Sequence, residues 1–479
     1  MEKIIDFLLS IIWSDALVIL CIVGGLYFSI QTKFVQVRLF KSMFLYLFRS
    51  KSSEKGVSSF QAFAIAISGR IGTGNIAGVA TAIAIGGPGA IFWMWLIAFF
   101  GASTAYVEAT LGQIYKEVKD GEYRGGPAFY IKKGLGSKKF AALFSIITII
   151  SCSFFLPGVQ SNSAAAALNQ AFEINSLYSG IGIALLLGFI IFGGVKRIAK
   201  AAEIIVPFMA IGYILMALLI IGMNITEVPS MFKLIFESAF GIHSTFGGIL
   251  GSAIAMGVKR GLYSNEAGQG TAPHAAAAAE VDHPAQQGLV QAFSIYVDTL
   301  FICTATALII LFSGLYNVSD GSDGFLYKNL TDVDSGPEFT QFAVDSFFPG
   351  FGFGFVAIAL FFFVFTTLMA YYYMAETNLS FMFKDKINPI ALFSLRIVLL
   401  LTIIFGAINT SARAWDLGDI GVGLMAWLNF IAILLLRKPA IIALRDFERQ
   451  KKLKVKKYHF NPKELGIKNT EAWDKDKME

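Results

Sequence analysis

Charged residues are scarce in this chain of 479 residues. They make up 15% of the sequence, whereas hydrophobic residues make up 56% and the mean hydropathy is +0.64. In an ordinary soluble domain about a quarter of the residues are charged. The composition therefore excludes a typical soluble enzyme and indicates a protein that crosses a membrane several times.

Cysteine and histidine are also rare, which limits the possible metal chemistry. The three cysteines, Cys21, Cys152 and Cys303, lie far apart in apolar segments, and the four histidines are scattered along the chain. Neither set has the close spacing of a metal site or the paired pattern of a disulfide framework. We therefore expect no metal cofactor.

Motifs of soluble or catalytic proteins are missing as well. The segment that starts at Gly72 has two glycines of a dinucleotide-binding fingerprint, but it lacks the third glycine and a βαβ context. The sequence contains no visible pairing of a nucleophile with a base, and no carbonyl filter motif. These absences argue against an enzyme and against a channel.

Long apolar segments account for most of the chain. A helix needs about 20 apolar residues to cross roughly 30 Å of hydrocarbon. Eleven windows have this character, and they cover residues 13–31, 57–85, 89–115, 140–169, 176–195, 201–222, 245–272, 287–314, 351–377, 389–409 and 414–436. The sequence therefore predicts an all-α integral membrane protein with eleven transmembrane helices.

The first 56 residues hold one further element besides the first span. Residues 34–49 mix aromatic and basic side chains and are too polar to cross a membrane. We expect an amphipathic helix at the membrane interface, with a basic loop as the alternative. Residues 1–56 thus form an N-terminal extension made of one transmembrane helix and one interfacial helix.

Lysine and arginine are distributed unequally between alternate loops. Most of the 39 basic residues fall in the loops on one side and in the tail at 437–479, whereas the loop at 316–347 has six carboxylates and only Lys328. Cytoplasmic loops retain an excess of positive charge. We therefore expect a protein of the cell membrane with its N-terminus outside and its basic tail in the cytoplasm. The net charge of +6 then reflects contact with the lipid bilayer and not with nucleic acid.

Without the first span, ten spans remain, and they divide into two sets of five with opposite orientation. The sets are residues 57–222 and 223–436, the second including the outer loop at 316–347. Each set opens with a span interrupted by glycines, at 68–78 and at 257–271. Interrupted spans at matching positions of inverted halves mark a transporter site. Close helix packing through small residues is the alternative explanation.

The first interruption would expose backbone groups in the middle of the membrane. If the helix stops at residues 72–75, the carbonyls of Ser68 and Ile71 lose their usual hydrogen-bond partners, which are the amides four residues later. The helix that restarts presents the amides of Thr73, Gly74 and Asn75, and a helix N-terminus favours a carboxylate. A zwitterionic amino acid would satisfy both needs.

The ninth span is apolar except for two adjacent threonines near its centre, Thr366 and Thr367. Their hydroxyls and the Phe363 carbonyl, together with the carbonyls of Ser68 and Ile71, give five neutral oxygens, a set that suits sodium. Hydrogen bonds from both threonines to carbonyls one turn earlier are the alternative. The centre of this span has no carboxylate, which argues against proton coupling there.

Charged and amide side chains inside the spans need partners, because a lone charge in hydrocarbon costs about 3 kcal/mol on insertion scales. We expect Arg70 to pair with Glu108 or Glu266, either as a gate or as a structural ion pair. Gln160 and Asn162 are candidates to bind the substrate, and hydrogen bonding between helices is the alternative for both. Lys259 and Arg260 also lie within a span, and the sequence assigns them no partner.

Three stretches, residues 69–79, 87–95 and 257–268, closely resemble the alanine or glycine:cation symporters of bacteria and archaea. The resemblance implies the leucine-transporter-like fold of the amino acid, polyamine and organocation transporters, a 5+5 inverted repeat that one extra helix precedes here. It also implies a sodium site on the five oxygens described above. The substrate site would lie on the broken second and seventh spans, with Gly257 and Asn265 contributed by the seventh.

The predicted function is therefore sodium-coupled symport. The chain would import alanine or glycine, in the L or D form, by alternating access, with sodium as a co-transported ion. The alternative is a proton-coupled or broader neutral amino acid transporter of the same fold. We expect the lipid bilayer, the ion and the amino acid as partners, without nucleic acid and without an obligate protein partner.

Overall fold

The computed structural model of the chain describes residues 2–473 apart from residues 323, 332 and 385, and it is almost entirely helical. Eight helices of the described chain are long and apolar enough to cross a membrane: Lys3–Gln31, Gly89–Ile114, Lys138–Phe172, Gly194–Met223, Pro284–Ser313, Gly352–Met382, Pro389–Ala407 and Ser411–Leu435. The other three predicted windows hold shorter or interrupted helices. The prediction of an all-α membrane protein is confirmed.

The elements of the first half follow the predicted windows closely. They are α1 (Glu2–Ile12), α2 (Asp15–Gln31), α3 (Val35–Arg38), α4 (Phe40–Leu47), α5 (Ser59–Arg70), η1 (Gly74–Gly78), α6 (Val79–Gly86), α7 (Gly89–Ile114), β1 (Glu117–Lys119), β2 (Glu122–Arg124), α8 (Pro127–Gly134), α9 (Lys138–Ile150), η2 (Ser151–Phe155), α10 (Leu156–Phe172), α11 (Ser176–Ile191) and α12 (Gly194–Met223). Helices α3 and α4 occupy the segment predicted to be amphipathic.

The second half repeats this succession of long helices. Its elements are η3 (Ile225–Glu227), α13 (Val228–Ala239), η4 (Gly247–Ile249), α14 (Leu250–Asn265), α15 (Ala272–Ala278), α16 (Pro284–Ile295), η5 (Tyr296–Cys303), α17 (Thr304–Ser313), β3 (Asn317–Ser319), β4 (Phe325–Lys328), α18 (Pro337–Phe347), α19 (Gly352–Met382), α20 (Pro389–Ala407), α21 (Ser411–Leu435), α22 (Arg437–Lys452) and η6 (Glu471–Trp473). The segments η1, η2 and η5 are π-helical, a feature that is frequent at functional sites.

Two small antiparallel hairpins, β1–β2 and β3–β4, were not predicted from the sequence. In the first, Lys119 pairs with Glu122, so that Asp120 and Gly121 form a two-residue turn. Both turn residues have positive φ, 53° and 80°. A type I′ turn requires this conformation and matches the twist of the strands. The signal was present as an Asp-Gly pair, but a flanking strand of three residues is too short to recognise.

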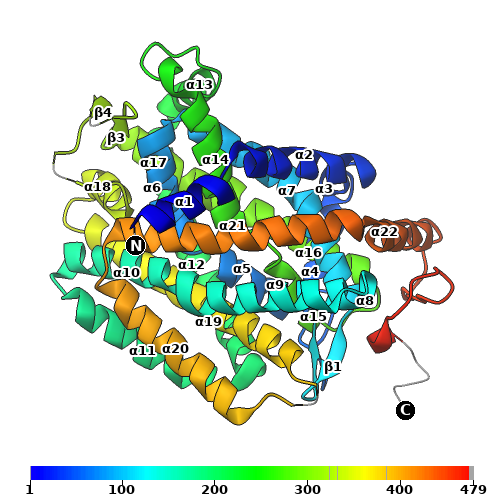
Figure 1. Cartoon of the computed structure of the whole chain (residues 1–479). Helices are drawn as coiled ribbons and strands as arrows, with labels where there is room; N and C mark the ends of the chain where they lie inside the picture. The colour runs from blue at the N-terminus through cyan, green and yellow to red at the C-terminus, as the bar shows by residue number, and fades with distance from the viewer. Residues whose placement is uncertain (1, 323, 332, 385, 474–479) are drawn as a thin grey trace.

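Figure 1 shows the helices running between two ends of the molecule, one near α18 and one near α22. The hairpin β3–β4 and helix α18, which belong to the acidic loop, lie at one end, and α8, β1 and α22 lie at the other. Helices α21 and α22 together form a nearly straight rod that reaches the second end. The acidic loop and the basic tail therefore lie at opposite ends, as the distribution of charge predicts.

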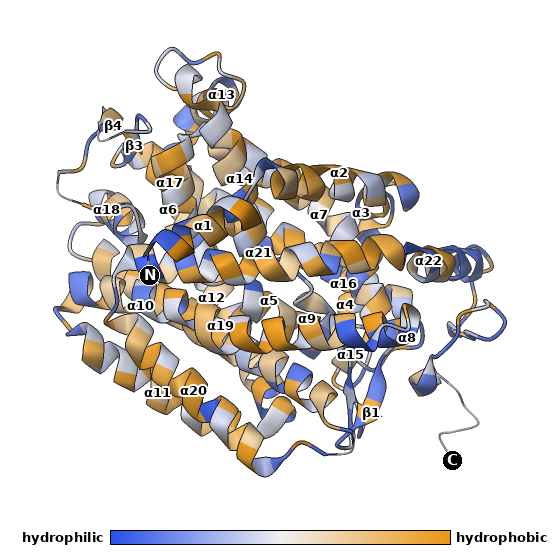
Figure 2. Cartoon of the chain, in the orientation of Figure 1, coloured by the Kyte–Doolittle hydropathy of each residue, from blue (hydrophilic) through white to orange (hydrophobic). Residues whose placement is uncertain are grey.

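Apolar side chains cover the flanks of the bundle and polar ones cover its ends. Figure 2 shows hydrophobic residues along α2, α11 and α20, and hydrophilic residues on α22 and the following tail. On α11, Leu185 and Phe189 are 71% and 73% exposed, and Phe208 on α12 is 70% exposed. A contiguous apolar surface of this kind is unfavourable in water, so these flanks are in contact with lipid.

The described part of the tail packs against the bundle. Arg38 lies 2.6 Å from Glu448 on α22. Beyond α22 the chain turns back, and Asn469 donates to the Lys133 carbonyl at 2.9 Å. The indole of Trp473 donates to the Gln113 carbonyl, also at 2.9 Å, at the end of α7. The tail is thus an ordered cover at this end of the molecule.

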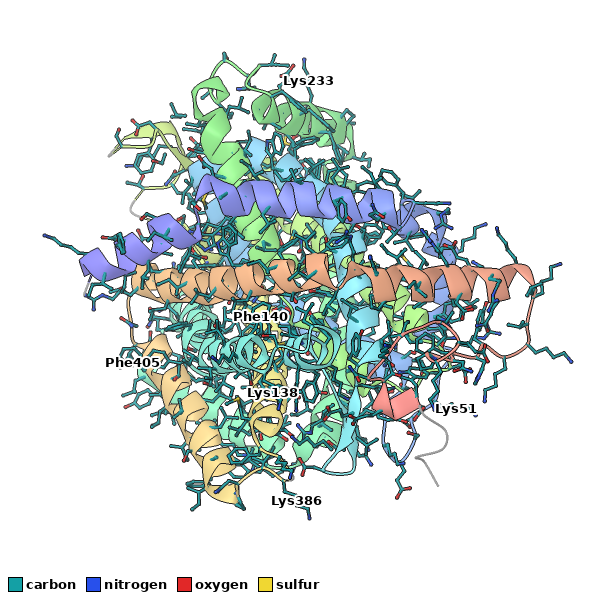
Figure 3. The ribbon with its side chains drawn as sticks, turned by 45° about the vertical axis from the view of Figure 1, so that its right-hand side comes forward. Lys51, Lys138, Phe140, Lys233, Lys386 and Phe405 are labelled. Carbon is teal, nitrogen blue, oxygen red and sulfur yellow. The ribbon has the colours of Figure 1, made fainter. Side chains whose placement is uncertain are left out.

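The opposite positions of charged loops lead to a labelling prediction. Figure 3 shows Lys51 and Lys233 in separate parts of the molecule, and both side chains are exposed. In intact cells, a membrane-impermeant maleimide should label a Lys233→Cys variant and should label Lys51→Cys only after permeabilisation. The unmodified chain is the control, because Cys21, Cys152 and Cys303 are buried. Equal labelling of both variants in intact cells would contradict the predicted orientation.

Candidate substrate and ion site

The second predicted span is interrupted between α5 and η1. Helix α5 ends at Arg70, and the amide of Gly72 donates to the side-chain oxygen Oδ1 of Asn75 at 2.9 Å. The amide of Asn75 donates to the Gly72 carbonyl at 3.2 Å. In a continuous helix these two amides would bond to the carbonyls of Ser68 and Ile71. The backbone therefore follows the predicted break, and a side chain stabilises it.

The glycines at the break allow three other spans to approach closely. A Cβ atom on Gly72 would lie 2.5 Å from the Thr367 hydroxyl and 2.9 Å from Gln160 Oε1. A Cβ atom on Gly74 would lie 3.0 Å from the Cα atom of Ser264 at the end of α14. Real Cβ atoms do not tolerate the first of these distances, so a larger residue at position 72 would displace its neighbours.

Four of the five residues predicted to bind sodium lie together beside the break. The Thr367 hydroxyl is 3.2 Å from the Ile71 carbonyl oxygen and 2.9 Å from that of Phe363. The Thr366 hydroxyl is 3.0 Å from the same Phe363 oxygen. Ser68 is buried on the last turn of α5, immediately before the break. The Ile71 carbonyl that the break frees therefore faces Thr367 across the interface of the second span and α19.

The threonine hydroxyls also make the bonds of the alternative explanation. Thr366 and Thr367 donate to carbonyl oxygens one turn earlier on α19, at 3.1 Å and 2.9 Å. A hydroxyl that donates its proton keeps two lone pairs as acceptors. Bonding back to the helix and binding a cation are thus compatible at both positions.

The two amide side chains of the fourth span point in different directions. Gln160 Oε1 accepts a hydrogen bond of 3.0 Å from the Thr73 amide and so stabilises the break. Asn162 donates instead to the carbonyls of Gly406 and Asn409, at 3.2 Å and 2.8 Å, near the end of α20. Residues two apart on a helix are separated by about 200° around its axis. Asn162 therefore connects helices, and the structure does not bring it to the break.

The seventh predicted span breaks at residues 266–271. Helix α14 continues to Asn265, and α15 begins at Ala272. Between them Glu266 has a φ of 56°, and Gly268 and Gly270 have φ values of 83° and 87°. These left-handed conformations end the helix, and glycine adopts them without a steric penalty.

Of the two residues expected to serve the substrate on this span, only Asn265 lies at the break. It accepts from the Ala267 amide at 3.0 Å through its side chain. Gly257 lies within the continuous part of α14, where a Cβ atom would be 2.5 Å from the carbonyl oxygen of Ala90 and 2.4 Å from Trp93 Cβ. Gly257 therefore allows α14 to pack closely against α7. This is the alternative explanation that the sequence analysis gave for glycines in the interrupted spans.

Arg70 connects the two breaks without forming the predicted ion pair. Its Nε atom donates to the Asn265 carbonyl at 2.7 Å, and its Nη1 atom donates to the Ser294 hydroxyl on α16. Within the described chain, the contacts of Arg70 include no direct ion pair with Glu108 or Glu266. The expectation of direct pairing is therefore corrected.

The reason for this difference is that both glutamates have other partners. Glu108 accepts from the amides of Gly268 and Gly270 at 3.3 Å and 3.2 Å, and from Asn429 Nδ2 at 2.8 Å. Glu266 accepts from the Thr271 hydroxyl at 2.8 Å. The carboxylate of Glu108 thus takes up amides that the second break frees, a role that sequence spacing alone does not indicate.

Asp298 is a buried carboxylate that the sequence analysis missed. It lies in η5 of the eighth predicted span and is 0% exposed. Its Oδ1 atom accepts from Asn75 Nδ2 at 2.7 Å, and its Oδ2 atom accepts from the hydroxyls of Ser264 and Thr299 at 2.9 Å and 2.7 Å. The available signal was a single aspartate in an apolar window, which by itself marks a functional candidate.

Asp419 on α21 is a second carboxylate that was missed, and it provides the partner for two cations of α14. Lys259 Nζ lies 2.7 Å from its Oδ2 atom, and Arg260 Nη1 lies 3.0 Å from its Oδ1 atom. The guanidinium of Arg260 also stacks on Trp415 at 4.1 Å. This group connects α14 to α21.

Several buried polar atoms around the breaks have no hydrogen-bond partner among the residues that the structure describes. They are Arg70 Nη2, Thr73 Oγ1, Tyr263 Oη, Asn265 Nδ2 and Glu266 Oε1. Buried polar groups are almost always paired, so a group of exceptions requires an explanation. The set contains donors and one carboxylate acceptor, which is what a molecule with both a carboxylate and an ammonium group would need.

Comparison with known proteins relates the chain to a family of transporters. A model of the sodium:alanine symporter family matches residues 1–462 of the chain. The putative sodium/proton-dependent alanine carrier protein YrbD of Bacillus subtilis strain 168 is 58% identical over 476 residues, which cover 99% of this chain and 98% of the relative. The sodium/proton-dependent alanine carrier protein of Bacillus sp. strain PS3 is 54% identical over 425 residues, 88% of this chain and 95% of the relative. The probable sodium/glutamine symporter GlnT of Bacillus subtilis is 44% identical over 454 residues, 94% and 92% of the two chains.

The close approach at the first break predicts opposite effects for two glycine substitutions. Gly72→Ala should destabilise the protein by about 1 to 3 kcal/mol, because its methyl group overlaps Thr367 and Gln160. Gly212→Ala on α12 is the matched control, since nothing lies within 4 Å of that Cβ position, and alanine should stabilise the helix by up to about 1 kcal/mol. Thermal unfolding in detergent measures both. Shifts of the same sign and size would show that position 72 is not crowded.

Proposed function

We propose that this chain, which belongs to the sodium:alanine symporter family, imports alanine together with sodium by alternating access. It is a carrier and not an enzyme. The family match extends over nearly the whole chain, and two relatives above 50% identity are named alanine carriers. The structural observation that carries the proposal is the contact between two interrupted spans, whose buried polar atoms lack partners.

The amino acid would bind between the two breaks. Thr73 Oγ1 and Asn265 Nδ2 are free donors for its carboxylate, and Glu266 Oε1 is a free acceptor for its ammonium group. Gln160 takes part by holding the Thr73 amide, and Gly74 lets the second span approach α14. A zwitterion bound here would satisfy groups that are otherwise buried without partners.

The crowding at the breaks favours a small substrate. Gly72 and Gly74 have no space for a side chain of their own, and the residues at both breaks are buried. Alanine or glycine, which add at most one methyl group, fit this environment better than a long amide side chain. The chain is also more similar to the relatives named alanine carriers than to the relative named a glutamine symporter.

Sodium would bind where the break of the second span faces α19. The carbonyls of Ser68, Ile71 and Phe363 and the hydroxyls of Thr366 and Thr367 would supply five neutral oxygens. An ion held there joins α5 to α19 and stabilises the states in which these helices are in contact. The ion can change the affinity for the substrate only by as much as the affinity for the ion itself differs between the conformational states. This coupling is typically about 1 to 3 kcal/mol, or about 5-fold to 150-fold.

The finer architecture is part of the same proposal. The chain would have eleven transmembrane helices, a 5+5 inverted repeat formed by residues 57–222 and 223–436, and flanking segments at 1–56 and 437–479. The position of each broken span at the start of its set, and their contact through Arg70 and Asn265, support this plan. The N-terminus would lie outside and the tail in the cytoplasm of a cell-membrane protein.

The sodium site can be tested by uptake of labelled alanine into proteoliposomes. An inward sodium gradient should stimulate uptake by the unmodified protein. In the Thr366→Ala, Thr367→Ala double variant this stimulation should be at least about tenfold smaller, a change within the range of allosteric coupling. The physical reason is the loss of two of the five oxygens.

Thr148→Ala is the matched control for this experiment. Thr148 is buried on α9 and its hydroxyl donates to the Phe144 carbonyl at 2.9 Å, one turn earlier. The variant removes the same type of bond without touching the proposed ion site, so sodium stimulation should persist. If the double variant behaves like this control, the threonines are structural. If uptake follows a proton gradient and ignores sodium, the alternative function holds.

A further inference from the structure

Helix α4 has an apolar face that the rest of the protein leaves largely uncovered. Phe40, Phe44 and Phe48 follow one another at intervals of four residues and are 45%, 56% and 62% exposed. Residues four apart lie on the same face of a helix. The opposite face packs against the bundle, where Met43 and Tyr46 are 0% and 2% exposed. The exposed aromatic face of α4 is therefore suited to the acyl chains of lipids at a membrane interface.

A cavity of about 250 Å³ lies next to the C-terminal end of α4. Its lining comes from four places in the chain: the segment 46–51, Ser59, the loop at 280–286, and the tail at 456–458. Ser59 is the first residue of α5, the helix that leads to the first break. The cavity therefore connects the end of the interfacial helix with the start of the second span and with the tail.

Three cations in the lining have no carboxylate partner. They are Arg49, Lys51 and Lys456, and all three side chains are exposed. Among the described residues, none of them forms an ion pair with a carboxylate. Figure 3 shows Lys51 close to the C-terminal segment of the chain. The positive charge of the cavity is therefore available to an anion that enters from outside.

The two carboxylates of the lining have partners of their own. Glu280 accepts from the Ser53 hydroxyl at 2.6 Å. Asp282 lies 3.6 Å from the ammonium group of Lys457, which is adjacent to the lining in the tail. Together with Lys457, the lining carries four cations against two carboxylates. An anion is therefore favoured over a cation as the ligand of this cavity.

Neutral hydroxyl groups complete a set of donors that suits phosphate. The side chains of Tyr46, Tyr458, Ser50 and Ser59 all line the cavity. Ser50 also holds the start of α5, because its Oγ atom accepts from the Ser59 amide at 2.7 Å. Phosphate oxygens accept from hydroxyl, ammonium and guanidinium groups, and a guanidinium can bind two of them at once. The lining therefore offers several donors to one phosphate group.

We infer that the cavity binds the phosphate headgroup of one anionic phospholipid, whose acyl chains lie along the exposed face of α4. Continuity between the two surfaces favours a lipid over a soluble phosphate, because Phe48 of the apolar face directly precedes Arg49 of the lining. Basic residues beside a membrane attract anionic lipids, and basic pockets at its surface bind their headgroups. In the proposed orientation this lipid belongs to the cytoplasmic leaflet.

A lipid in this place would join three parts of the protein. It would contact α4, the loop that holds the start of α5, and the tail after α22. The second span, which contains the first break, would thus have a lipid ligand at its end. The inference adds this ligand to the protein and does not depend on which solute the chain carries.

Lipid binding can be measured on the full chain purified in detergent, by native mass spectrometry and by thermal unfolding. Phosphatidylglycerol, which has a net negative charge, should bind and raise the Tm, and zwitterionic phosphatidylcholine should do so at least about tenfold more weakly. The triple variant Arg49→Gln, Lys51→Gln, Lys456→Gln should also lose at least about tenfold in affinity for phosphatidylglycerol. The reason is that each basic residue near an anionic surface contributes about fivefold.

The matched control is the triple variant Lys138→Gln, Lys139→Gln, Lys386→Gln. It removes the same charge from three exposed lysines outside the cavity. Figure 3 shows Lys138 and Lys386 well separated from Lys51. This variant should bind phosphatidylglycerol like the unmodified protein. The Tm of each variant without lipid shows whether it is folded.

A soluble headgroup separates a lipid site from a site for free phosphate. Glycerol 3-phosphate should bind at least about tenfold more weakly than phosphatidylglycerol, because it has no acyl chains to cover α4. Equal affinity for the two would overturn the inference and identify a soluble phosphate compound as the ligand. It would also be overturned if phosphatidylcholine bound as well as phosphatidylglycerol, if the cavity variant bound normally, or if both triple variants lost affinity equally. The comparison of the three ligands uses the unmodified protein and needs no variant to fold.

Discussion

Inside a membrane every backbone N–H and C=O group must find a partner within the protein, and the rest of this structure depends on that constraint. Two spans nevertheless break there. The break after α5 persists because Asn75 and Gln160 accept from the freed amides, and the break after α14 persists because Glu108 accepts from two others. The first role of these polar side chains in the core is therefore to bond the backbone amides that the broken helices free.

The same side chains create the conditions for transport. Carboxylates such as Glu108 and Asp298, which serve backbone and side-chain donors, place negative charge in the core close to both breaks. A cation that enters from outside would be attracted to this region, and carbonyls freed at the first break would provide oxygens for it. Coupling between the proposed ion and substrate sites would then need no long pathway, because the first break would contribute to both.

Much of this site could be predicted from the sequence because it depends on local rules. Glycines in two apolar windows indicated both breaks. The adjacent threonines of the ninth span indicated the helix face that lies opposite the first break. The partners of charged residues could not be predicted. Which helix face a residue occupies decides whether it reaches the break, as Gln160 and Asn162 show, and pairings such as that of Arg260 with Asp419 join residues far apart in the chain.

The sequence by itself determined the membrane location, the helical class, the approximate spans, the place of the first break and the fact that the seventh span also breaks. These properties follow from hydropathy and from the conformational freedom of glycine, which act over a few residues. Only the tertiary structure decided which polar groups meet. It placed Asp298 between Asn75 and Ser264, directed Arg70 to a carbonyl in place of a carboxylate, and assigned Gly257 to packing. Those outcomes depend on the rotation and contact of helices, which no local pattern in the chain encodes.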